Sequence, residues 1–125
     1  INNYLIDIEG TNKTSPYDLV YLMGRVDHGE LISKESREFM YEVMAKCKNR
    51  SLLPQGLDAD AKIIHKTGTL GIMIGDAGIV TTGSGDRYAI AVQVDRKRND
   101  RRANELVRNI SRVVFDTFAG AAQRK

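Results

Sequence analysis

The chain has 125 residues, of which 42% are hydrophobic and 28% are charged, and its formal net charge is +3. This length predicts one domain with its own core, and the composition excludes a disordered or fibrous chain. The single cysteine, Cys47, excludes a disulfide within the chain and fits no metal-binding pattern. No stretch approaches the roughly 18 apolar residues that a membrane-spanning helix requires.

The first part of the chain, residues 1–58, is predicted to be helical. Its opening residues, 1–9, fit either a short helix or an irregular segment. A hydroxyl residue followed by Pro16 and Asp18 predicts a helix start, because these residues cap the first turn and suit its dipole. A second helix is expected from Ser33, and the two would form a helical hairpin. The predicted buried face of the second helix consists of Phe39, Met40, Val43, Met44 and Cys47.

The second part, residues 59–125, changes character. Residues 61–69, about 74–81 and 87–95 are predicted strands, because β-branched residues crowd them and no helical period fits. Short links between them favour antiparallel pairing. Asn99 or Asp100 is expected to cap a final helix with a regular apolar stripe. The predicted fold class is therefore α+β, with a helical hairpin and a three-stranded antiparallel sheet covered by a C-terminal helix.

The first predicted strand carries the sequence His65-Lys66-Thr67-Gly68-Thr69. Lys66 supplies a positive charge, Thr67 supplies a hydroxyl, and Gly68 lets a ligand approach the backbone because it has no Cβ. Together they would hold a carboxylate and align an acyl group along the strand. Lys-Thr-Gly is one signature of penicillin-recognising serine enzymes. Three residues also recur by chance, and an exposed strand lysine is commonly a solvated edge charge.

With this context, the chain resembles the C-terminal half of the serine β-lactamase and penicillin-binding-protein superfamily, nearest the class A-like β-lactamase enzyme family. The matching phrases are residues 12–19, 29–33, 53–68 and 76–80. The resemblance implies an α/β sandwich part of a β-lactamase-like fold, acyl transfer by a serine without a cofactor or metal, and a periplasmic or secreted location. It implies that Lys66 assists proton movement, that Thr67 binds the substrate carboxylate, and that the Thr69 N–H is an oxyanion-hole donor.

The superfamily's other signatures are absent from these residues. No serine is followed by lysine three positions later, and there is no Ser-x-Asn or Tyr-x-Asn. The chain begins at Ile1 without a methionine or signal-peptide pattern, so we expect a piece of a longer protein. We expect this piece alone to be inactive. The missing N-terminal half or a homodimer partner would cover its apolar faces, and the substrate would be a β-lactam or a peptide-like amide.

Some roles have two interpretations. His65 is either a strand histidine half-packed against the helical part or a substrate-contacting group, and Asp76 is either a partner of Lys66 or a turn residue. The predicted strand at Asp76 lacks the arginine that helps bind carboxylate in many class A enzymes, which leaves Arg101 or Arg102 as possible substitutes.

Three functions compete. The first is part of a serine β-lactamase-like hydrolase, and the second is a non-catalytic penicillin-binding or pseudo-enzyme module. The remote third is nucleic-acid binding through the basic run at residues 96–102. Since no aromatic residues are interleaved with that run, we expect no nucleic-acid partner.

Overall fold

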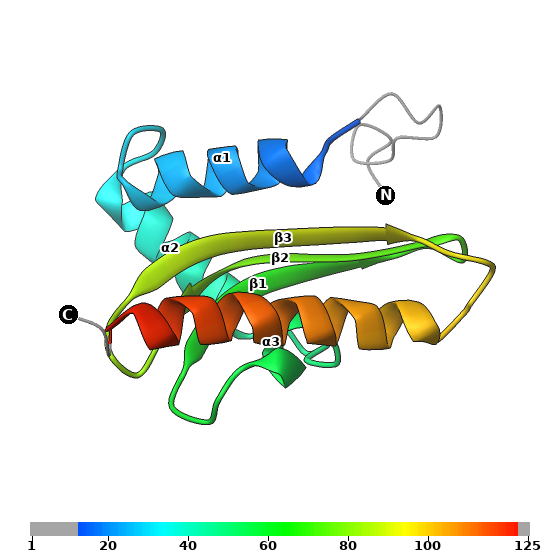
Figure 1. Cartoon of the computed structure of the whole chain (residues 1–125). Coiled ribbons are helices and arrows are strands. Elements are labelled where there is room, and N and C mark those ends of the chain that lie inside the picture. The colour runs from blue at the N-terminus through cyan, green and yellow to red at the C-terminus, as the bar shows by residue number, and fades with distance from the viewer. Residues whose placement is uncertain (1–12, 123–125) are drawn as a thin grey trace.

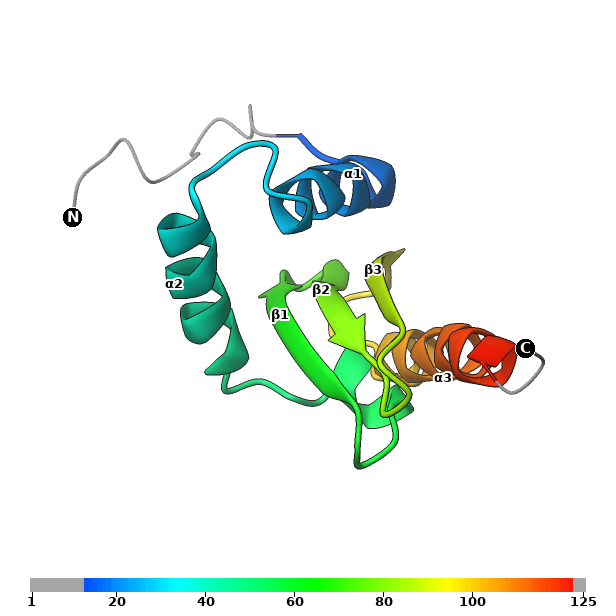
Figure 2. The same ribbon diagram turned by 90° about the vertical axis from the view of Figure 1, so that its left-hand side faces the viewer.

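The computed structural model describes residues 13–122, which form three layers (Figure 1). Two helices lie on one face of a three-stranded sheet, and a long helix lies on the other (Figures 1 and 2). The predicted α+β fold class is confirmed. In chain order, the elements are α1 (Pro16–Asp27), α2 (Lys34–Ala45), the short 3-10 helix η2 (Leu53–Gly56), β1 (Lys62–Thr69), β2 (Met73–Thr81), β3 (Arg87–Asp95) and α3 (Arg102–Ala122).

The start of α1 follows from local side-chain chemistry. The Ser15 hydroxyl accepts a hydrogen bond from the Asp18 N–H, and the Asp18 carboxylate accepts one from the Ser15 N–H. Pro16 occupies the first helical turn, where its missing N–H costs nothing. The same logic begins α2, where the Ser33 hydroxyl accepts from the Ser36 N–H. Both predicted helix starts are confirmed, whereas residues 1–9 lie outside the described part of the chain.

The predicted buried face of α2 is wrong in part. Phe39 and Val43 are 69% and 54% exposed, while Met40 and Met44 are half-buried and face the sheet. Cys47 lies beyond the helix, which ends at Ala45. The apolar stripe of α2 is wider than its area of contact with the sheet, which is made to β1. The helical spacing of apolar residues therefore predicts more buried positions than the contact of α2 with β1 actually buries.

The sheet has the order β1-β2-β3, and both neighbouring pairs are antiparallel, as predicted. α1 contacts β2 and β3, and α2 contacts β1. On the opposite face, α3 and η2 pack together and close the main core. The core residues include Leu52, Leu53, Ile63, Ile74, Val80, Tyr88, Ile90, Val92, Val107 and Phe115. No helix within residues 13–122 is both long and apolar enough to cross a membrane.

One ion pair fastens the helical hairpin to the sheet. The Arg87 guanidinium at the start of β3 donates two hydrogen bonds, of 2.8 and 2.7 Å, to the Asp27 carboxylate at the end of α1. The Tyr41 hydroxyl of α2 donates to the same carboxylate. The hydrogen bond from Arg87 is the main cause that lowers the pKa of Asp27 to about 2. The two helices of the hairpin and the distant strand β3 thus meet at one carboxylate.

Replacing Arg87 by alanine leaves the Asp27 carboxylate without its cation, so we expect the free energy of unfolding at pH 7 to fall by about 1–2 kcal/mol. Folding lowers the pKa of Asp27, so this contribution is present above the ordinary value of 3.8 and is lost as the pH falls through about 2. Urea unfolding at pH 7 and pH 2 measures it. The control Lys34→Ala removes an exposed pair with Glu38 and should cost less than about 0.5 kcal/mol. Equal losses for the two variants at pH 7 would contradict the prediction.

Candidate functional site

The backbone of β1 has one border that β2 does not occupy. Leu70 and Met73 exchange both of their backbone hydrogen bonds, at 2.8 and 3.3 Å. Because bonded and non-bonded pairs alternate along an antiparallel ladder, the next pair, Thr69 with Ile74, is non-bonded. The same counting makes the pair of Thr67 with Asp76 non-bonded. The N–H and C=O groups of Thr67 and Thr69 therefore point away from β2, and we call these four groups the open border.

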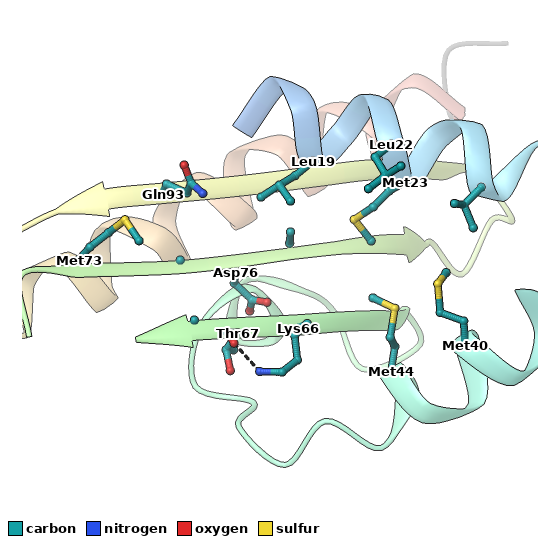
Figure 3. Close-up of a pocket in the computed structure, with 14 residues that line it drawn as sticks. Leu19, Leu22, Met23, Met40, Met44, Lys66, Thr67, Met73, Asp76 and Gln93 are labelled. Atoms are coloured by element: carbon teal, nitrogen blue, oxygen red, sulfur yellow. Dashed lines mark hydrogen bonds between the residues drawn. The ribbon is translucent and has the colours of Figure 1, made fainter. Parts of the chain in front are cut away.

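Lys66 stands beside the open border on the side of the helical hairpin. Its side chain is exposed, and its Nζ donates to the Thr67 carbonyl at 2.6 Å (Figure 3). It lines a groove of about 370 Å³ between α1, α2 and the sheet, which we call the sheet–helix groove. Most of the other lining is apolar and includes Leu19, Leu22, Met23, Met40, Met44, Met73 and Ala77. The amine thus carries a positive charge at the polar end of a largely apolar groove.

The remaining residues of the motif, Thr67, Gly68 and Thr69, follow Lys66 along β1. Thr67 is half-buried and Thr69 is exposed. Thr67 and Gly68 line the sheet–helix groove together with Lys66. Thr69 does not line the groove, but its backbone N–H and C=O belong to the open border. A Cβ added at Gly68 would meet no heavy atom within 4 Å. The structure therefore places the Lys66 amine, the Thr67 and Thr69 backbone groups and the free space at Gly68 next to one another along β1.

His65 lies on the opposite face of β1, because side chains alternate along a strand. Its ring is completely buried, so in this structure it does not reach a ligand in the sheet–helix groove. Its Nδ1 lies 2.9 and 3.1 Å from the two carboxylate oxygens of Asp76, which also accepts from the Leu53 N–H at 3.1 Å. This differs from the expected half-packed ring. The structure also places Asp76 within β2 rather than in a turn, with His65 rather than Lys66 as its hydrogen-bonding partner.

This buried pair of His65 and Asp76 was not predicted from the sequence. The short link between the first two strands could have indicated it, because the link determines the register of the two strands. Counting back from the pair of Leu70 and Met73 places Asp76 opposite Thr67, and therefore one step along the same face from His65.

Gly78 makes room for the buried histidine. It is the register partner of His65, and a Cβ on Gly78 would lie 2.7 Å from the His65 Cβ and 2.5 Å from the Ile64 carbonyl oxygen. Real Cβ atoms do not approach other atoms so closely, and one of these two neighbours is backbone. The absence of a side chain at Gly78 therefore permits the His65–Asp76 pair to form behind the motif.

The pair of substitutions Gly78→Ala and Gly68→Ala tests this geometry. We expect Gly78→Ala to lower the free energy of unfolding by about 1–3 kcal/mol, because β1 and β2 must move apart to admit the methyl group. Gly68→Ala, on the neighbouring strand, meets open space and should change it by less than about 0.5 kcal/mol. Thermal and urea unfolding measure both variants. A Gly78→Ala protein as stable as Gly68→Ala would refute the close approach.

The two arginines considered as carboxylate ligands lie elsewhere. Arg102 forms an ion pair with Asp100 at 2.6 Å, and the Asp100 carboxylate also accepts from the Arg102 N–H at the start of α3. Of the two expected helix caps, Asp100 is therefore the one whose side chain accepts from the first helical N–H, although it lies two residues before Arg102. Neither Arg101 nor Arg102 lines the sheet–helix groove. Within residues 13–122, no group of three or more His, Cys, Asp or Glu residues is placed to bind a metal ion.

Comparisons with known proteins give the geometry its context. The model of the β-lactamase enzyme family matches residues 1–118. A structure of PBP-A is 46% identical, with a TM-score of 0.88 over 96% of this chain and 45% of that chain. A PBP-A mutant in an acyl-enzyme complex with penicillin G is 45% identical, with a TM-score of 0.88 over 96% and 46% of the two chains. A β-lactamase from Chitinophaga pinensis is 32% identical, with a TM-score of 0.78 over 88% and 44%. A comparison with curated proteins gave no match.

The chain belongs to the β-lactamase enzyme family, because the family model covers nearly all of it. The family resemblance read from the motif and its context is thereby confirmed. The chain spans slightly less than half the length of the solved structures that it matches, for example 45% of PBP-A.

Proposed function

We propose that this chain supplies one wall of the acylation site of a serine β-lactamase-like hydrolase. The observation that carries the proposal is the open border of β1, which presents the Thr67 and Thr69 backbone groups next to the Lys66 amine and the free space at Gly68. An extended acyl group lying along this border could hydrogen-bond to the backbone while its carboxylate meets Lys66 and Thr67. β-Lactams and peptide-like amides combine those two features.

In the proposed reaction, a serine oxygen forms a bond to the carbonyl carbon of the substrate. The amide C–N bond then breaks, the serine proton ends on the leaving nitrogen, and an acyl-enzyme remains. The Thr69 N–H would donate to the carbonyl oxygen as it gains negative charge. Such preorganised donors matter because the charge develops only in the transition state. Lys66 would assist proton movement through its positive potential, and Thr67 would hold the substrate carboxylate.

The serine itself is not among these 125 residues, since none of their serines is followed by lysine three positions later. The proposed partner is therefore the N-terminal half of the protein, with a homodimer as the alternative. The apolar lining of the sheet–helix groove supports a covering partner of one of these kinds. The acyl-enzyme complex of the similar PBP-A mutant with penicillin G supports a penicillin-like substrate. A periplasmic or secreted location is proposed from the family alone.

A second candidate function is a penicillin-binding or pseudo-enzyme module without turnover. The observation that favours it is the same lack of a Ser-x-x-Lys sequence in these residues. The two candidates differ in whether a covalent bond to the ligand forms.

Labelling the complete gene product with fluorescent penicillin tests the hydrolase proposal. We expect a covalent adduct that survives denaturation, and we expect Lys66→Ala to lower the labelling rate by about 10²-fold, as for loss of a group that assists proton transfer. The control Lys62→Ala removes an exposed lysine of the same strand that lies outside the groove, and it should label normally. A product that binds penicillin reversibly but never covalently would favour the pseudo-enzyme. No binding at all would refute both.

Gly68→Ala separates ligand access from folding. The added methyl group occupies the space through which a ligand would approach the open border, so we expect labelling of the complete protein to slow by about tenfold or more. Its unfolding midpoint should match that of the wild type, because nothing lies within 4 Å of the new Cβ. Normal labelling of Gly68→Ala would show that the acyl group does not run past this glycine.

A further inference from the structure

The turn between β1 and β2, residues 70–72, accepts hydrogen bonds from the segment that follows β3. All three carbonyl groups of residues 70–72 accept hydrogen bonds from residues 96–99, which follow β3. The Leu70 carbonyl accepts from the Arg96 guanidinium at 3.1 Å. The Gly71 carbonyl accepts from the Asn99 N–H, and the Ile72 carbonyl from the Arg96 N–H, both at 2.8 Å. We call residues 96–100 the clasp.

Arg96 links the turn to the last helix. Its Nη2 donates to the Leu70 carbonyl, while its Nη1 lies 3.5 Å from the Asp100 carbonyl and 3.5 Å from the Asn104 side-chain oxygen. The guanidinium is planar and offers donors in fixed directions, so it can hold these partners in one relative position. A lysine has a single nitrogen at its end and could replace only part of this arrangement.

Asn99 shows that the conformation of the clasp is enforced. It is the only non-glycine residue with a positive φ, 58°, in the part of the chain that the structure describes. Such a conformation is less favourable than the usual ones, although asparagine tolerates it better than most residues. It directs the Asn99 N–H to the Gly71 carbonyl. Strained backbone of this kind persists where the surroundings determine it, and it is common at functional sites.

The clasped turn directly follows the proposed oxyanion donor. Thr69 is the last residue of β1, and its N–H belongs to the open border, where β2 does not hold it. The direction of this N–H therefore depends on the peptide groups on either side. On the C-terminal side, Leu70 is held by three hydrogen bonds. Its N–H donates to the Met73 carbonyl, and its own carbonyl accepts from the Met73 N–H and from Arg96.

We propose that the clasp aims the Thr69 N–H at the reacting carbonyl group, which makes Arg96 a positioning residue for acylation. The inference rests on the function proposed above, because it concerns the same site. Among the described residues, the side chain of Arg96 hydrogen-bonds to Leu70, Asp100 and Asn104 and to none of the motif side chains, and it does not line the sheet–helix groove. Its effect on the site would therefore pass through the turn. Small displacements of a reacting or stabilising group can lower a rate by up to about 10²-fold. The clasp should thus affect the chemical step and leave the initial binding of ligand largely unchanged.

The test measures acylation of the complete gene product by fluorescent penicillin over a range of concentrations. We expect Arg96→Met to lower the limiting acylation rate constant by about tenfold, while the concentration at half-saturation changes by less than about twofold. Arg96→Lys should regain part of the rate. The control Lys97→Met alters an exposed neighbour within the clasp and should match the wild type.

A second pair of variants tests the clasp without removing the arginine. Asn99→Gly keeps easy access to positive φ and should acylate normally, whereas Asn99→Val disfavours that conformation and should slow acylation as Arg96→Met does. Amide hydrogen exchange at residues 70, 73, 96 and 99, whose N–H groups donate within the turn or to it, should be faster in the slow variants, with the middle of β3 unchanged.

Normal acylation by both Arg96→Met and Asn99→Val would overturn the inference while leaving the proposed function intact. A slow variant with unaltered exchange at residues 70, 73, 96 and 99, or an equal loss in Lys97→Met, would also overturn it. A wild-type protein that never forms the adduct would instead overturn the proposed function, and the inference about acylation would fall with it.

Discussion

The candidate site depends on the alternation of backbone hydrogen bonds along β1. Each residue of a strand directs its N–H and C=O to one side only, so a strand paired on one side leaves every second residue with no partner strand for its polar groups. The reciprocal pair of Leu70 and Met73 determines which residues these are. They include Thr67 and Thr69. If the register of β1 against β2 shifted by one residue, the backbone groups of Lys66 and Gly68 would point away from β2 instead. The chemistry proposed for the motif is available only in the observed register.

The two faces of β1 have different environments. The face toward the helical hairpin carries Lys66, whose charge needs access to solvent or ligand. The other face carries His65, which pairs with Asp76 inside the protein and is sealed by η2 and α3. A buried polar pair is strongly directional, because each group loses more if its partner is misplaced than an apolar side chain would. The pair therefore fixes the position of the motif strand from behind.

Long-range contacts then hold the parts of the site to one another. The Asp27–Arg87 ion pair joins the helical hairpin to the sheet and so sets the position of one wall of the sheet–helix groove. At the other end of the sheet, the clasp joins the turn after Thr69 to the start of α3. The chain spans slightly less than half the length of the solved structures that it matches, and its own contacts already hold the groove and the turn to the rest of the fold.

The sequence by itself determined the features that depend on neighbouring residues. The cap of Ser15 and Asp18, the strand limits and the presence of Lys66, Thr67 and Gly68 on a strand could all be read from short stretches, and their context was enough to indicate the family. Only the tertiary structure decided the burial of His65 against Asp76 and the exposure of Phe39 and Val43. It also placed Arg102 away from the groove and closed the clasp on residues 70–72. The physical reason is that caps and periodicity act within one or two turns of chain, whereas pairing and burial depend on residues tens of positions apart.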